Sequence, residues 1–190
     1  MCKRNNSALS FTCSLIEQLG RTLHIERGTV AAVLGAKSIG AIYDHADVLH
    51  CEPIEKVADD AVEEFGLHSG SFDNISTAKF NVPDVWTMGK VHARVVEDVS
   101  GETDVVDTLL NVYVSWINEK LSDYNSAFYY QPRDYIAECY RIPYFTTVLN
   151  LCEYGFSKQR GEWFHKCKNE RTPLFEHFYR KAGLFLCLSP

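Results

Sequence analysis

The sequence lacks the short motifs by which common enzymes are recognised. It has no GxxxxGK[ST] loop and no GxGxxG segment after a strand, so nucleotide hydrolysis and a Rossmann cofactor have no support. HExxH and GxSxG are also missing, which removes two common hydrolase patterns. The sequence therefore predicts no enzymatic activity, no catalytic residues and no cofactor.

Long apolar runs are also missing. No run approaches the roughly 18 apolar residues that a membrane span needs. The first ten residues include bases but no apolar stretch typical of a secretory signal. With six prolines and eleven glycines among 190 residues, the composition is that of a folded chain rather than of a low-complexity linker. We expect a cytoplasmic protein that does not bind membranes.

Seven cysteines are present, an odd number, and none forms a CxxC pair. This pattern argues against a disulfide framework and against a zinc ribbon. Metal-ligand side chains do gather at His45, Asp47, His50 and Cys51, but two histidines five residues apart on one helix point about 140° apart. No metal site is predicted. Cys152 or Cys167 with His165 leaves a Cys/His enzyme as an alternative, although no third, orienting group is discernible.

Apolar residues recur at helical spacing along almost the whole chain, which predicts an all-α protein. The clearest stripe lies in a helix over 53–65, with Pro53 at its first position and Gly66 at its end. Further helices are expected from Ser7 or Ser10 to Leu23, over 29–34, from Ser38 to Leu49, from Asp84 to Gly101, from Thr103 to beyond Leu121, and after Pro132 and Pro173.

Residues 67–83 are rich in glycine, serine and asparagine and break this periodicity, so they are the best candidate linker. The predicted architecture is a small four-helix N-terminal unit over 7–66, packed on a larger aromatic-rich helical unit over 84–188. Of the 24 aromatic residues, 18 lie between Tyr113 and Phe185, inside the second unit. Its tyrosines are interpreted as core or protein interface, with base stacking as the alternative.

Charge is unevenly distributed. Residues 44–64 contain eight carboxylates and only one basic residue among lysines and arginines, Lys56. A second acidic cluster spans 97–107. Such a balance disfavours direct nucleic-acid binding and favours either a cationic partner or simple solubility. Because the apolar stripe of the 53–65 helix must face the core, its acids must face water. The predicted partner-binding residues are Asp44, Asp47, Glu52, Glu55, Asp59 and Glu63.

Residues 10–65 contain two local patterns: FxxxxIE, at Phe11, Ile16 and Glu17, and the segment IYDxADVLH, which includes Tyr43, Asp44, Asp47, Val48, Leu49 and His50. Through these patterns, residues 10–65 resemble a family of short, uncharacterised bacterial helical proteins. Members of this family are often encoded beside predicted ADP-ribosyltransferase-like proteins, which implies a toxin–antitoxin or mobile-element setting. The chain departs from the family by continuing for over a hundred residues and by carrying Cys51-Glu52-Pro53 at the usual polar turn.

Together these features predict a non-enzymatic, antitoxin-like inhibitor that neutralises a basic protein through the acidic residues. The alternatives are an inhibitor, of phage or mobile-element origin, that mimics DNA and blocks a nucleic-acid-binding defence protein, and the Cys/His enzyme. The sequence does not indicate the oligomeric state.

Overall fold

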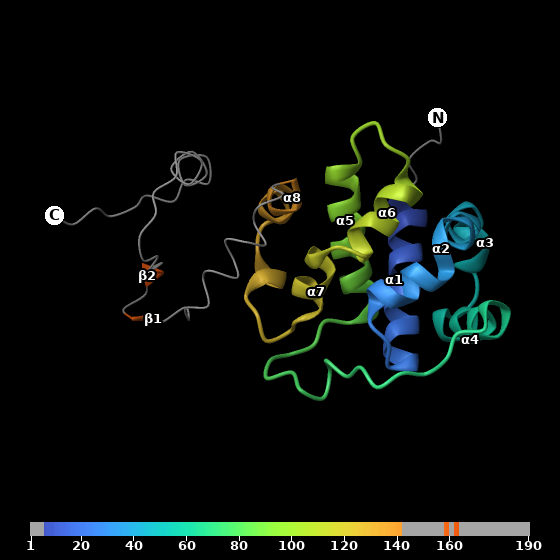
Figure 1. Ribbon diagram of the computed structural model, residues 1–190, viewed down its shortest axis with the longest axis horizontal. Helices are drawn as coiled ribbons and strands as arrows, with labels where there is room; N and C mark the ends of the chain where they lie inside the picture. The colour runs from blue at the N-terminus through green and yellow to red at the C-terminus, as the bar shows by residue number, and fades with distance from the viewer. Residues whose placement is uncertain (1–5, 142–157, 160–161, 164–190) are drawn as a thin grey trace. The chain divides into compact units, whose positions relative to one another are not determined.

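The computed structural model describes residues 6–141, 158–159 and 162–163. The chain divides into two compact units, residues 1–141 and 142–190. In the second unit, β1 (Lys158–Gln159) pairs antiparallel with β2 (Glu162–Trp163), with Lys158 opposite Trp163 and Gln159 opposite Glu162. In residues 6–141 every regular element is a helix (Figure 1), so the predicted all-α class is confirmed.

The first unit is built around α1 (Asn6–Leu23), which packs against α2 (Arg27–Asp44), α4 (Ile54–Phe65) and α5 (Val85–Ser100). All five residues predicted for its apolar face are buried: Phe11, Leu15, Ile16, Leu19 and Leu23. The buried surface extends further around the helix than a surface helix requires, because α1 has neighbours on several sides. It therefore includes polar side chains, among them Ser14 and Glu17.

The next three helices form the edge of the unit. α2 (Arg27–Asp44) is broken at Gly35, whose φ of 67° is costly for residues with a side chain, and this confirms the predicted end of a helix at that position. α3 (Ala46–Leu49) is a single turn. α4 (Ile54–Phe65) begins one residue later than predicted, with Pro53 at the N-cap, and it ends at Gly66 in the left-handed conformation, as predicted.

α5 (Val85–Ser100) runs antiparallel to α1 (Figure 1). Asp84 caps it by accepting a hydrogen bond from the Thr87 backbone N–H at 2.8 Å, which confirms the predicted start. The two helices touch where Gly89 faces Ser14, since a Cβ at Gly89 would lie 2.7 Å from the Ser14 backbone nitrogen. Glycine is needed here so that the two backbones can approach.

The helix predicted from Thr103 to beyond Leu121 is wrong as a single element. The structure has α6 (Val105–Tyr113) and α7 (Trp116–Ser122), separated at Val114 and Ser115. The Ser115 hydroxyl donates to the Val112 carbonyl oxygen at 2.7 Å, so a side chain competes with the helical backbone at the break. A short 3-10 helix, η1 (Phe128–Tyr130), and α8 (Arg133–Arg141) follow, the latter beginning after Pro132 as predicted.

The boundaries of the units differ from those predicted. Helices on both sides of residues 67–83 belong to one compact unit that ends at Arg141, because α1 packs directly on α5. Backbone hydrogen bonds hold the predicted linker against this unit, from Gly70 to Leu23 at 2.7 Å and from Phe72 to His24 at 2.8 Å. The division into 7–66 and 84–188 therefore does not describe this part of the chain.

Candidate functional site: an acidic surface with an aromatic edge

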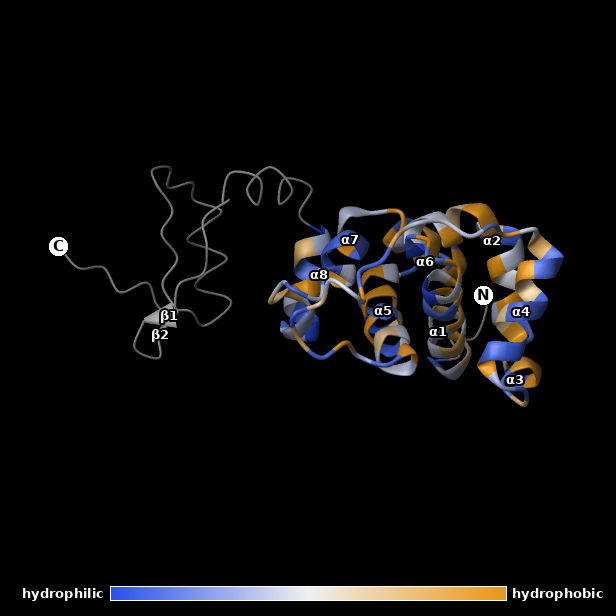
Figure 2. Cartoon of the chain, turned by 90° about the horizontal axis from the view of Figure 1, so that it is seen from below, coloured by the Kyte–Doolittle hydropathy of each residue, from blue (hydrophilic) through white to orange (hydrophobic). Residues whose placement is uncertain are grey.

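The six predicted partner-binding residues are all exposed on one edge of the first unit. They lie at the end of α2, in α3, in the turn before α4 and on α4: Asp44, Asp47, Glu52, Glu55, Asp59 and Glu63. We call these six the acidic surface. In Figure 2, α3 and α4 lie at the end of the unit opposite α8, and α4 shows separate hydrophilic and hydrophobic sides.

The geometry of α4 explains the exposure of its acids. Glu55, Asp59 and Glu63 follow one another at four-residue intervals, which places their carboxylates along one side of the helix at a rise of about 6 Å per step. The opposite side is buried through Ile54, Val57, Ala58 and Ala61. The packing of α4 on α1 thus fixes the direction in which the carboxylates point.

The acidic surface has little internal charge compensation. Glu52 pairs with Lys56 at 2.9 Å, an exposed pair, and among the side chains described no ion pair involves the other five. No base lies in the last turn of α2 or of α4, where Asp44 and Glu63 are located. A negative charge near a helix C-terminus is unfavourable, because that end already carries partial negative charge.

The second acidic cluster is used differently. Arg133 of α8 forms ion pairs with Glu97 at 2.9 Å and with Asp98 at 2.5 Å, both on α5. Asp104 caps α6 by accepting a hydrogen bond from the Val106 backbone N–H at 2.8 Å. These carboxylates therefore have structural partners, whereas most of the acidic surface does not.

An aromatic group formed by Phe11, His50 and Trp86 adjoins the acidic surface. The ring centroids of His50 and Trp86 are 5.6 Å apart, and Phe11 lies 5.5 Å from His50 and 6.3 Å from Trp86. Phe11 is buried, but Trp86 is 39% exposed, and Val48, next to Asp47 in α3, is 70% exposed. Exposed apolar side chains beside charged ones are typical of protein interfaces.

The metal-ligand side chains at 45–51 do not converge. The His45 Nδ1 lies 2.8 Å from the Ala41 carbonyl oxygen, whereas the His50 ring faces Phe11 and Trp86. Within residues 6–141, no three side chains of histidine, cysteine, aspartate or glutamate are arranged to hold a metal ion. Cys152, His165 and Cys167, the alternative catalytic set, lie outside the described residues.

A buried ion pair, which the sequence pattern did not reveal, joins α1 to α2. Glu17 and Arg27 are each 1% exposed, and Arg27 donates from Nε and Nη2 to the two Glu17 oxygens at 2.9 and 2.8 Å. Arg21 and the Tyr124 hydroxyl also donate to Glu17, at 2.6 and 3.0 Å. The one hint in the sequence that Glu17 is buried is its spacing from Cys13 and Gly20, which places all three on one side of α1. The burial of Glu17 also depends on neighbours distant in sequence.

His92 and Tyr113 extend this buried polar region. Their rings stack with centroids 4.6 Å apart, and the His92 nitrogens face the Met88 carbonyl oxygen at 3.1 Å and Asn118 Oδ1 at 3.2 Å. Burial lowers the pKa of His92, although the negative charge of Glu17 acts to raise it. His92 and Tyr113 are buried and hold the helices together, so they are not a candidate binding site.

The lowered pKa values of Glu17 and His92 predict that the fold loses stability in acid. Burial alone would raise the pKa of Glu17, but the hydrogen bond and charge of Arg27, with the charge of Arg21, lower it to about 2 from 4.5. Because both Glu17 and His92 bind protons more readily in the unfolded chain, both lose stabilising free energy as the pH falls. The His92 contribution falls from about pH 6.5 downwards, and the Glu17 contribution, about 3 kcal/mol, falls between about pH 5 and 2.

Urea unfolding followed by circular dichroism at a series of pH values would measure this loss. High salt should be present throughout, because protonating the acidic surface relieves repulsion and has the opposite sign. The variant His92→Gln should lose the fall that begins near pH 6.5 and keep the fall at lower pH. A free energy of unfolding that stays constant from neutral pH to about pH 3 would contradict the prediction.

No family model, curated protein or solved structure matches the chain in comparisons with known proteins. The resemblance to short bacterial helical proteins therefore stays a prediction. None of the helices in the described part of the chain is long and apolar enough to cross a membrane.

Proposed function

We propose that the protein is a non-enzymatic inhibitor that binds and neutralises a basic protein through the acidic surface. The observation that carries the proposal is that five of its six carboxylates are exposed without an ion pair among the described side chains. Two of them, Asp44 and Glu63, also lie in the last turns of helices, where negative charge is disfavoured. A cationic partner would relieve both costs on binding.

The aromatic group supports a protein partner rather than mere solvation. Trp86 and Val48 expose apolar surface next to the charges, and tryptophan is among the residues that contribute most to binding free energy at interfaces. We expect no direct binding to nucleic acid, because the acidic surface would repel phosphates. A toxin or a nucleic-acid-binding protein, whose basic groove the carboxylates would occupy, fits this surface.

Charge reversal tests the proposal. Changing Asp47, Glu55, Asp59 and Glu63 to lysine is expected to abolish binding to a partner captured by affinity pull-down, and circular dichroism should show unchanged helicity. Association of the wild-type protein should slow as salt rises, because screening shortens electrostatic steering to about 8–10 Å at 0.1–0.15 M salt.

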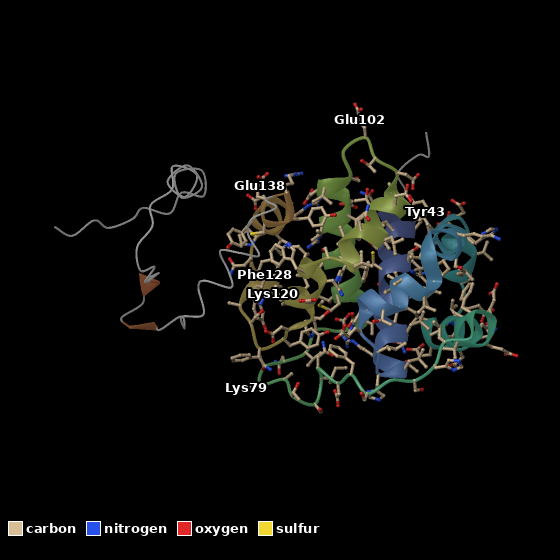
Figure 3. All side chains as sticks on the ribbon, viewed as in Figure 1. Tyr43, Lys79, Glu102, Lys120, Phe128 and Glu138 are labelled. Carbon is tan, nitrogen blue, oxygen red and sulfur yellow. The ribbon has the colours of Figure 1, made fainter. Side chains whose placement is uncertain are left out.

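A matched control changes the same number of charges elsewhere. Glu102, Glu119, Asp123 and Asp134 are exposed and lie on the α5–α6 loop, on α7, in the turn after it and on α8. Glu102 marks the tip of its loop in Figure 3. Changing these four control residues to lysine should reduce the association rate modestly and leave the complex intact. Equal loss of binding in both variants, or no loss in either, would exclude the acidic surface as the binding site.

Competition separates the two kinds of partner. If the captured protein binds DNA or RNA, an excess of duplex should displace it from the acidic surface, as expected for a nucleic-acid mimic. A toxin that does not bind nucleic acid should remain bound.

A further inference from the structure

In the aromatic group, the Trp86 indole is partly exposed and is packed against two other rings. Phe11 is 2% exposed, so it forms a fixed base, and His50 packs against both Phe11 and Trp86. With two ring neighbours, the Trp86 side chain is held in place, yet 39% of the residue stays exposed. An aromatic ring that is ordered before binding loses little conformational entropy on contact, which favours its use as an anchor.

Negative charge lies next to this indole through α3. Asp47 precedes His50 by three residues, and the His50 backbone N–H bonds to the Ala46 carbonyl oxygen at 2.9 Å, so the two side chains share one side of a helical turn. Asp47 is exposed and forms no ion pair among the described residues. The exposed indole and a free carboxylate therefore border the same surface.

A cation suits this pairing, and an arginine suits it best. Tryptophan has the most attractive ring face for a cation, and a guanidinium can stack flat on it while its N–H groups reach a carboxylate. A lysine ammonium can satisfy the charge but cannot stack. In the described part of the chain the arginines over aromatic rings are Arg21 over Tyr124 and Arg27 over Phe72, so neither occupies Trp86.

We infer that Trp86, supported by His50 and Phe11, stacks against an arginine side chain of the basic partner, and that Asp47 accepts hydrogen bonds from the same guanidinium. The inference rests on the proposed function and specifies its partner as a segment that contains arginine. Lys90 lies one turn beyond Trp86 on α5 and is exposed, so it opposes the approach of a cation. Its removal should therefore strengthen binding.

The test uses the full chain and two synthetic peptides that differ only in having arginine or lysine at every basic position. The arginine peptide should bind about two- to five-fold more tightly. The chain has three tryptophans, and Trp86→Phe identifies the indole N–H signal of Trp86 in a nitrogen–proton correlation spectrum. That signal should shift on adding the arginine peptide. Trp86→Ala should remove the preference for arginine, and Lys90→Ala should tighten binding of the arginine peptide.

The outcomes separate this inference from the proposed function. If the two peptides bind with equal affinity and the Trp86 signal does not move, the role of Trp86 is overturned. In that case, the acidic surface would still be supported if neither peptide binds the four-lysine variant. Binding of neither peptide at low salt overturns both. Circular dichroism on Trp86→Ala and Trp86→Phe checks that the helices are intact, and a preference for arginine that persists in both variants also contradicts the inference.

Discussion

Replacing Glu17 with alanine is expected to destabilise the protein by about 3–5 kcal/mol, enough to unfold many small domains. The reason is that the Arg27 guanidinium would stay buried at 1% exposure without its charge partner. Arg21 and the Tyr124 hydroxyl would lose the same acceptor. Urea unfolding at neutral pH, monitored by circular dichroism, measures the change.

Two comparisons isolate the cause. Glu52→Ala also removes an ion-paired glutamate, but its pair with Lys56 is exposed and joins residues only four positions apart, so stability should hardly change. The double variant Glu17→Met, Arg27→Met removes both buried charges and should recover much of the loss, because apolar side chains of similar volume fill the space. If Glu17→Ala proves as mild as Glu52→Ala, the buried pair does not stabilise the fold.

Gly89→Ala is the second change with a large expected effect, a loss of about 2–3 kcal/mol. The new Cβ would lie 2.0 Å from the Ser14 Oγ and 2.7 and 2.8 Å from the Ser14 backbone nitrogen and Cα. The hydroxyl can rotate away, but the backbone cannot, so α1 and α5 must separate. Alanine is a better helix former than glycine by about 1 kcal/mol, and the clash should outweigh that gain.

Gly40→Ala is the matched control for this clash. Gly40 is also inside a helix, α2, but the nearest atom to its added Cβ is the Val106 Cγ1 at 4.0 Å. With ordinary contact and no clash, helix propensity decides the outcome, and stability should rise by up to about 1 kcal/mol. Thermal unfolding of both variants is the measurement. A rise in stability for Gly89→Ala would show that α1 and α5 are not in close contact there.

Local signals were sufficient for most helix boundaries. Asp84 and Gly66 each act through neighbours within a few residues, as cap and as left-handed terminator, so their effect can be read from the chain itself. The break at Ser115 was missed because the apolar spacing continues through it from Tyr113 to Ile117. Periodicity reports which side of a segment is apolar, not whether its backbone bends.

For the acidic surface, the sequence predicts the exposure of the carboxylates but not their ion pairs. Exposure of Glu55, Asp59 and Glu63 follows from the apolar stripe opposite them, and the structure agrees. In the sequence, residues 97–107 look like a comparable acidic cluster, because counting charges does not show which carboxylates form ion pairs. Only folding brings Arg133 to Glu97 and Asp98 and leaves the acidic surface largely uncompensated.

By itself, the sequence determined the all-α class, the apolar sides of the helices and the exposure of the acidic surface, because each depends on spacing within one segment. Tertiary structure alone decided the contacts between segments. It closed one unit across residues 67–83, buried Glu17 against Arg27 and placed Trp86 of α5 beside His50 of α3. Such contacts join residues ten or more positions apart, where the sequence contains no local signal of which residues will meet.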